Sequence, residues 1–207
     1  MTSFARAERA ALADSLLAAG PDAPTLCEGW STRDLAAHLV LRERRPDAAA
    51  GILLRVLSDH TNRVQRQLAM GDYPALVSKV RQPPLWVRPD TVEETMNLVE
   101  FFVHHEDVRR AAPGWTPRQL SFEYERRLSD RLRGSAKLSA RRFPATIIAH
   151  APGAEPLRVG AGGDQLDVRG APGELLLFFV GRQRVADVEV AGPAPLADRL
   201  RTARLGL

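Results

Sequence analysis

The sequence lacks most of the features by which an enzyme class is usually recognised. Its single cysteine, Cys27, excludes an intramolecular disulfide. It contains no glycine-rich phosphate loop, serine elbow, HExxH motif or CxxC pair, so kinase, hydrolase, zincin and Rossmann functions lose their usual support. No apolar run approaches the roughly eighteen residues that span a bilayer, and no signal peptide is visible. We therefore expect a cytoplasmic protein without a membrane partner.

The chain also has little net charge for a protein of basic character. It carries 29 Lys and Arg against 25 Asp and Glu, which gives a formal net charge of +4 and an isoelectric point of about 9.9. A basic chain raises the question of nucleic-acid binding. The arginines are dispersed among acidic residues, however, and no long Lys/Arg run or recognition motif is present. We predict no nucleic-acid partner.

The hydrophobic periodicity changes along the 207 residues. Apolar residues recur at helical spacing over the first two-thirds, and short strand-like runs bounded by Gly and Pro follow from about Phe143. The expected helices cover residues 3–19, 31–45, 48–69, 74–80, 91–110, 122–138, 171–180 and 195–204, and the expected strands 145–149, 157–159, 165–168 and 186–190. This pattern predicts an α+β protein with a helical domain at residues 1–140 and a small α+β domain at residues 141–207.

Two of the expected helices begin with a capping-box pattern. Ser31 is followed three residues later by Asp34, and Thr91 is followed by Glu94. In such a box the hydroxyl accepts a hydrogen bond from the backbone N–H three residues on, and the acidic side chain reaches back to the first residue. The two patterns predict helix starts at residues 31 and 91.

Three polar residues in these helices point to metal chemistry. Glu100 and His104 are four residues apart, so they share one helix face, and His38 lies in a second helix. If the two faces meet in a bundle, two imidazoles and a carboxylate converge, and three such ligands with open positions form a catalytic metal site. Glu100 lies among apolar neighbours, where a carboxylate is costly unless it is paired or bound to a cation.

Each of these residues also has a structural interpretation. His38 among apolar neighbours is compatible with a satisfied core histidine, and Glu100 with an arginine pair. Asp107, three residues after His104, is either a hydrogen-bond partner of that imidazole or a solvated charge at a helix end. Cys27 has no base at a diagnostic spacing, which favours a small buried residue over a nucleophile.

Two arginines and three further histidines need an interpretation beside His38 and His104. Arg42 and Arg45 follow His38 by four and seven residues, so they extend its stripe, either to grip an anionic substrate or as a solvated helix end. His105 should face away from His104. His60 and His150 have no partner pattern, which favours surface or structural roles.

Two segments resemble a known family. LCEGWSTRDLAAHLV and VEFFVHHEDVRRA resemble the two metal-ligand segments of the mycothiol-dependent maleylpyruvate isomerase family, and RERRPDAAAG with FVHHEDVRRA is similar to an actinobacterial branch of it. DVRGAPGELLLFFVGRQ and ADVEVAG resemble its C-terminal domain. The resemblance implies a DinB-like four-helix bundle followed by a small, sterol-carrier-like α+β domain.

The resemblance also implies a function. The metal ligands would be His38, Glu100 and His104, and the ion a divalent metal, usually zinc. The protein would be a thiol transferase or an isomerase that uses mycothiol as cosubstrate against an anionic electrophile. The isomerase also needs a C-terminal arginine, for which Arg182 is a candidate. The competing expectation is a non-enzymatic metal- or ligand-binding sensor, and either protein would be a monomer or a homodimer.

Overall fold

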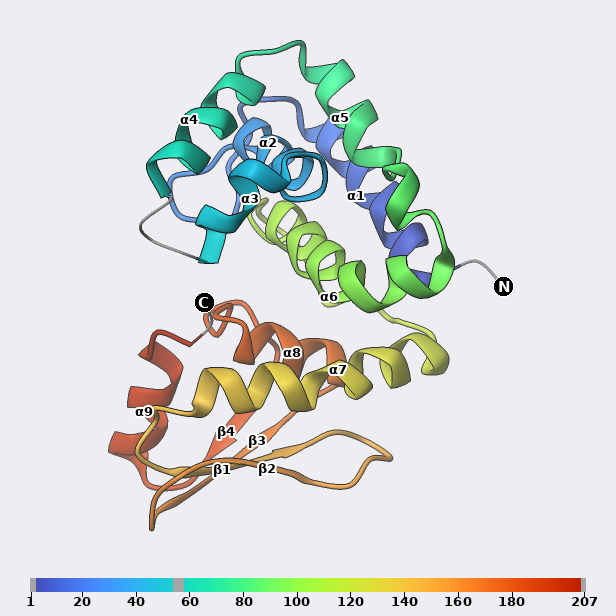
Figure 1. Ribbon diagram of the computed structural model, residues 1–207. Coiled ribbons are helices and arrows are strands. Elements are labelled where there is room, and N and C mark those ends of the chain that lie inside the picture. Colours follow the sequence, from blue (N-terminus) through green and yellow to red (C-terminus); the bar gives the residue numbers. More distant parts are fainter. Residues whose placement is uncertain (1–2, 54–57, 206–207) are drawn as a thin grey trace. The chain divides into compact units, whose positions relative to one another are not determined.

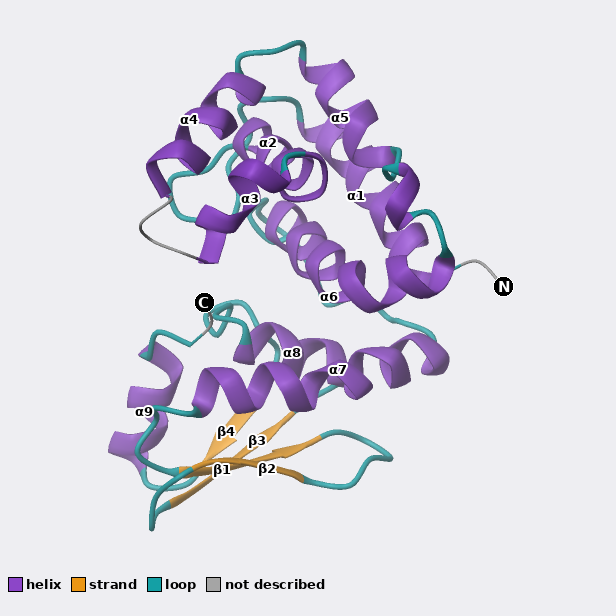
Figure 2. Cartoon of the chain, viewed as in Figure 1, coloured by secondary structure: helices purple, strands orange, loops and turns teal. Residues whose placement is uncertain are grey.

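The chain divides into two compact units, Met1–Trp115 and Thr116–Leu207. The computed structural model describes residues 3–53 and 58–205 (Figure 1). In these ranges the first unit has helices without strands, and the second combines helices with a sheet (Figure 2). This arrangement confirms the predicted α+β class. None of the described helices is long and apolar enough to cross a membrane.

The N-terminal unit is built around the pairing of its first and last long helices. Its elements are α1 (Phe4–Ala19), α2 (Thr32–Arg44), α3 (Pro46–Leu53), α4 (Ser58–Ala69), α5 (Tyr73–Arg81), the short 3-10 helix η2 (Leu85–Val87) and α6 (Asp90–Arg109). Helix α1 packs along α6, and α2 packs against α4 and α5. The main core is formed by apolar faces of α1, α2, α5 and α6, represented by Leu12, Leu16, Leu35, Leu39, Val77 and Phe101. A single helix was expected at 48–69. The described parts are α3 and α4, and residues 54–57 of that prediction lie outside the described residues.

The two predicted capping boxes had different outcomes. The Ser31–Asp34 box is present, and it starts α2 as expected. The Thr91–Glu94 box is wrong, because the N-cap of α6 is Pro89, two residues before Thr91, and no described side chain caps it. Glu94 instead accepts hydrogen bonds from Ser3 Oγ at 2.6 Å and from the backbone N of Ala5 at 3.0 Å. A tertiary contact to the start of α1 has therefore replaced the local cap.

The C-terminal unit is a four-stranded sheet with helices packed on it. Its elements are α7 (Phe122–Ala140), β1 (Thr146–His150), β2 (Leu157–Gly160), β3 (Gln165–Arg169), α8 (Pro172–Phe179), β4 (Glu189–Ala191) and α9 (Ala194–Thr202). The strand order is β2-β1-β3-β4. Strand β1 is antiparallel to β2 and parallel to β3, and β3 is antiparallel to β4. Helix α8 is buried along its whole length, which explains its unbroken apolar run.

The division between the units differs from the boundary expected near residue 140. Helix α7 packs on α8 and also contacts β2, so it belongs to the C-terminal unit (Figure 1). Its buried positions, Leu128, Leu132 and Ala136, form one apolar stripe. A helical period shows that such a stripe is buried but not which core buries it. The domain limits 1–140 and 141–207 therefore remain predictions about independent folding.

Candidate metal centre

Helices α2 and α6 bring His38, Glu100 and His104 together. His38 Nε2 lies 3.4 Å from Glu100 Oε1, and His104 Nε2 lies 3.2 Å from the same oxygen. The three potential ligand atoms all lie within 4.8 Å of one another. The predicted meeting of the two helix faces is present, with Glu100 and His104 one turn apart on α6. Whether these residues hold a metal ion stays a prediction.

The two histidines of this set are held in a buried environment. His38 is 8% exposed and lies on α2 between buried apolar neighbours, with the Trp30 ring centroid 5.0 Å from its own. The centroids of the His38 and His104 rings are 5.5 Å apart, with the rings nearly perpendicular. The side chain of Glu100 is more open, at 25% exposed. The set therefore has a buried histidine side and a more accessible carboxylate side.

Burial and hydrogen bonding shift the three pKa values in different directions, and that of His104 moves away from the neutral form that coordinates a metal ion. Burial lowers the pKa of His38, which favours the neutral imidazole. Burial would raise the pKa of Glu100, but hydrogen bonds from His104 and His38 hold it well below its usual value. Burial would lower the pKa of His104, but its contacts with Asp107, Cys27 and Glu100 hold it well above the ordinary range. Glu100 is therefore an ionised carboxylate with two imidazoles beside it.

Asp107 fixes the ring of His104 from the other side. Its Oδ2 lies 2.9 Å from His104 Nδ1, and the residue is fully buried. The alternative of a solvated charge at a helix end is therefore wrong. When a metal ion is bound to a histidine, a carboxylate on Nδ1 holds the tautomer whose Nε2 lone pair is available to the ion. In this protein Nε2 faces Glu100.

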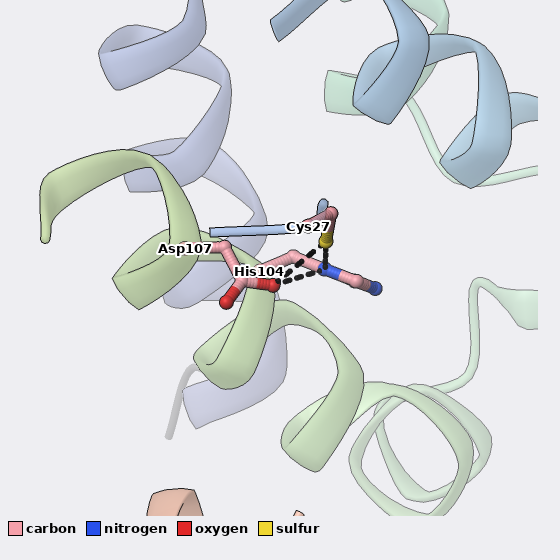
Figure 3. Close-up of side chains that lie close together, drawn as sticks. All are labelled: Cys27, His104 and Asp107. Carbon is pink, nitrogen blue, oxygen red and sulfur yellow. Dashed lines mark hydrogen bonds and ion pairs between the residues drawn. The ribbon is translucent and has the colours of Figure 1, made fainter. Parts of the chain in front are cut away.

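Cys27 also lies at this site, which the sequence interpretation missed. It is half-buried, and its Sγ lies 3.3 Å from Asp107 Oδ2 and 3.9 Å from His104 Nδ1 (Figure 3). Cys27 precedes Asp107 by 80 residues, so no local spacing signals the contact. The interpretation as a small buried residue stays a prediction, because Cys27 also packs against the core of this unit.

The two arginines after His38 separate from one another. Arg42 Nε lies 3.4 Å from Glu100 Oε1, while its Nη1 donates to Asn97 Oδ1 at 2.7 Å and its Nη2 to the carbonyl of Met96 at 3.0 Å. Its guanidinium is thus tied to α6. Arg45 lies just past the end of α2, and its exposed guanidinium pairs with Asp47 at 2.7 Å. The predicted stripe therefore ends at Arg42.

His105 faces away from His104, as expected. Its Nδ1 contacts Glu8 Oε1 at 2.5 Å, and its Nε2 lies 2.9 Å from Ser15 Oγ. This order matches a Ser-His-Glu triad, but Ser15 lies inside α1, where backbone N–H groups are used by the helix and cannot serve as oxyanion donors. The contacts instead join α1 to α6.

The other two histidines form pairs on elements away from this set. His60 lies 3.3 Å from Asp47 Oδ2, and His150 lies 2.6 Å from Asp167 Oδ1. Both side chains are partly exposed. The interpretation of these histidines as surface or structural residues fits their positions.

Comparison with known proteins points to one family. Residues 4–52 match the family described as the mycothiol maleylpyruvate isomerase N-terminal domain. Two solved structures are similar over 92% of this chain and 96% of their own. The crystal structure of a histidine-to-alanine mutant of the mycothiol-dependent maleylpyruvate isomerase has 15% identity and a TM-score of 0.59, and the crystal structure of the mycothiol-dependent maleylpyruvate isomerase has 16% and 0.54. No curated protein sequence gives a significant match.

These matches confirm the family resemblance at two levels. The family match covers the segment that contains α1, α2 and His38, and the structural matches extend the likeness in fold to nearly the whole chain. Glu100 and His104 lie beyond the matched segment, so their assignment depends on the geometry above. Arg182, which donates to the carbonyl of Val180, stays an untested candidate for the family's C-terminal arginine.

Proposed function

We propose that this protein binds one zinc-like divalent ion through His38, Glu100 and His104, and that it is a mycothiol-dependent enzyme. The observation that carries the proposal is the convergence of three ligand atoms from α2 and α6, all within 4.8 Å of one another. The reaction class is thiol transfer to an anionic electrophile, or isomerisation if the thiol leaves again. The family match to the mycothiol maleylpyruvate isomerase N-terminal domain supports the choice of thiol.

The donor set fits a catalytic zinc ion. Two histidines and one carboxylate are a known catalytic combination, and they leave the fourth position open. Ligand atoms about 2.0–2.1 Å from an ion at tetrahedral angles lie about 3.3–3.4 Å apart. The two separations from Glu100 Oε1, 3.4 Å to His38 and 3.2 Å to His104, agree with this value. When bound, such an ion would lower the pKa of a coordinated thiol and supply thiolate at neutral pH.

The surrounding residues would prepare the ligands for this task. Burial keeps His38 neutral, which is the form that can coordinate. Asp107 holds Nδ1 of His104 and leaves Nε2 toward the ion. Arg42 brings a fixed positive charge to Glu100 from within α2. That charge favours an anionic substrate over a neutral one, because it adds to the charge of the ion.

The role proposed for Arg42 is more limited than a bidentate grip on the substrate. Both terminal nitrogens of its guanidinium already donate to α6, to Asn97 and Met96. Replacement by alanine should therefore leave the metal bound and weaken the use of an anionic substrate by long-range attraction alone. We expect a rise in KM of about tenfold or less, equivalent to about 1.4 kcal/mol, since no direct contact with the substrate is lost.

The decisive variant is His104→Ala. Untagged wild-type protein should contain about one divalent ion per chain by elemental analysis, and the variant should lose both the ion and thiol transfer, because two ligands hold an ion poorly. Exposed His60 offers a matched control, since His60→Ala also removes one imidazole but should change neither property. The assay would combine mycothiol, with other small thiols for comparison, and electrophiles such as maleylpyruvate.

Two outcomes would contradict this function. Thiol transfer by a metal-free His104→Ala protein would refute metal activation. Metal-loaded wild type that is inert with the whole panel, yet binds a small molecule tightly, would favour a non-enzymatic binding protein.

A further inference from the structure

The imidazole of His104 lies between two sets of donor atoms. Its Nε2 faces Glu100 and His38, the set described above. Its Nδ1 faces a second set, in which Asp107 Oδ2 is 2.9 Å away and Cys27 Sγ 3.9 Å away (Figure 3). These three atoms also lie within 4.8 Å of one another. A thiol, an imidazole and a carboxylate form a donor set of the kind that zinc and softer ions accept.

The position of Cys27 is fixed by the backbone around it. Its N–H donates to Thr25 Oγ1 at 3.2 Å, and its carbonyl accepts from the N–H of Trp30 at 2.9 Å. The next residue back, Leu26, donates its N–H to the carbonyl of Asp107 at 3.0 Å. The loop is thereby joined to the last turn of α6 at the residue that supplies the carboxylate. These backbone contacts place the Cys27 side chain beside Asp107 and His104.

The spacing of the second set is compatible with an ion between its members. Bonds of about 2.3 Å to sulfur and about 2.0–2.1 Å to nitrogen and oxygen place tetrahedral ligands about 3.3–3.6 Å apart. The three observed separations are 2.9 Å between Nδ1 and Oδ2, 3.3 Å between Sγ and Oδ2, and 3.9 Å between Sγ and Nδ1. Each differs from the expected value by about half an ångström or less, which side-chain rotation can supply.

We propose that Cys27, Asp107 and Nδ1 of His104 form a second metal site, for a thiophilic divalent ion such as Cd²⁺. Thiolate is the softest ligand in the chain and selects such ions, whereas two imidazoles and a carboxylate suit a borderline ion. Occupation releases the Cys27 thiol proton and the Nδ1 proton to water and leaves Nε2 protonated.

The two sites exclude one another, because a neutral imidazole has one lone pair and His104 belongs to both. The mutual exclusion rests on the proposed function, because it requires that His104 is also a ligand of the first site. A thiophilic ion at the second site removes a ligand from the first. The choice between the sites is set by the softness of the ion.

The test is titration of metal-free, full-length protein with Cd²⁺. Binding is detected by the ultraviolet absorption band of thiolate-to-cadmium charge transfer, and the amount bound is measured by elemental analysis after dialysis. Wild type should show the band and bind one Cd²⁺ per chain. His38→Ala, which alters only the first set, should keep the band. Cys27→Ser, which keeps a hydroxyl donor toward Asp107, should lose it, and Asp107→Asn should weaken Cd²⁺ binding at least tenfold. Circular dichroism would confirm that each variant is folded.

Several results would overturn the second site. They are the absence of the band in wild type, equal Cd²⁺ affinity in wild type and Cys27→Ser, or loss of the band in His38→Ala. Two Cd²⁺ per chain would refute the mutual exclusion. Zinc binding by the same variants separates this inference from the proposed function: loss of zinc in His38→Ala with retention in Cys27→Ser supports the first site, whatever the outcome with cadmium.

Discussion

The two units of this chain treat charge in different ways. In the N-terminal unit, Arg9, Glu43 and Glu93 form an ion cluster in which no member is more than 5% exposed. In the C-terminal unit, ion pairs such as Arg126–Glu123 lie at the surface, with both side chains about half exposed. The sheet core is formed instead by apolar residues such as Leu166 and Val168. Among the described residues the helical unit therefore buries more charged side chains than the C-terminal unit, in which Glu174 is a buried carboxylate.

The buried cluster leads directly to the candidate metal centre. Arg9 binds both oxygens of Glu43, and Glu43 Oε1 also accepts from Asn97 Nδ2 at 2.9 Å. The other end of the Asn97 amide accepts from Arg42, which contacts Glu100. Buried ion pairs contribute little net stability but can specify one arrangement of the groups they join. We infer from this difference that the helical unit buries polar groups because they position Arg42 and Glu100.

The largest expected effect is a difference in stability between two fragments that end at different sides of α7. Residues 1–115 should fold alone, with helical circular dichroism and a cooperative melt, because α1 to α6 share one core. Extension to residue 140 adds α7 without the sheet and α8, so its Leu128 stripe is exposed. Fragment 1–140 should therefore be no more stable than 1–115 and more prone to aggregate. A sharper, more stable melt for 1–140 would show instead that α7 belongs with the helical domain.

Removal of Arg9 tests the energetic side of the comparison. Arg9→Ala leaves Glu43 and Glu93 buried without their cation, so the free energy of unfolding should fall by about 3–5 kcal/mol. The measurement is urea unfolding of the full chain. The matched control, Arg126→Ala, deletes the same charge from an exposed pair and should change stability little. Equal losses in the two variants would refute the proposed difference between the units.

The smallest expected effect is a difference in the pH dependence of stability. Burial raises the pKa of Glu93 above 4.5, so the folded state holds this proton more tightly than the unfolded state, and stability is lost as pH rises through the raised pKa. Glu93→Gln removes that loss. The stability of the variant relative to wild type should therefore increase with pH from 4.5 upward.

Glu123 is the control with the opposite sign. Its hydrogen bond from Arg126 lowers its pKa, so its contribution is present above 4.5 and is lost as pH falls through the lowered value. At pH values above the lowered pKa, Glu123→Gln should therefore be less stable than wild type, and at lower pH the difference should disappear. Urea unfolding at several pH values checks both slopes, and parallel slopes would contradict the interpretation.

Local sequence signals predicted the elements of the fold well, but not their tertiary partners. The Ser31–Asp34 cap and the helical period of α1, α2 and α6 are properties of neighbouring residues, and the structure confirms them. The cap predicted at Thr91 is absent, and Glu94 instead accepts a hydrogen bond from Ser3, 91 residues away. The assignment of α7 to a unit could not be predicted, since an apolar stripe does not identify the core that covers it.

In the candidate site, too, local spacing could be predicted from the sequence, but most contacts with distant residues could not. The four-residue spacing of Glu100 and His104 places both on one face, and the structure shows His38 beside them. The spacing of Asp107 and His104 left two alternatives, and the buried hydrogen bond between them selects one. The position of Cys27 was not identified, because contact between a distant loop and a helix leaves no periodic signal. Arg45 fits the expected alternative of a solvated helix end, because α2 ends at Arg44 and a stripe continues only as far as its helix.

The loop that carries Cys27 also gives α6 an ending that can be followed by hydrogen exchange. The backbone carbonyls in the last turn of a helix have no partner within it, and that of Asp107 is paired with the N–H of Leu26. Unwinding of this turn would release the Leu26 amide and withdraw the carboxylate from His104 in one event. Exchange of that single amide therefore reports on how often the support of His104 opens, and an ion bound to His104 should slow it.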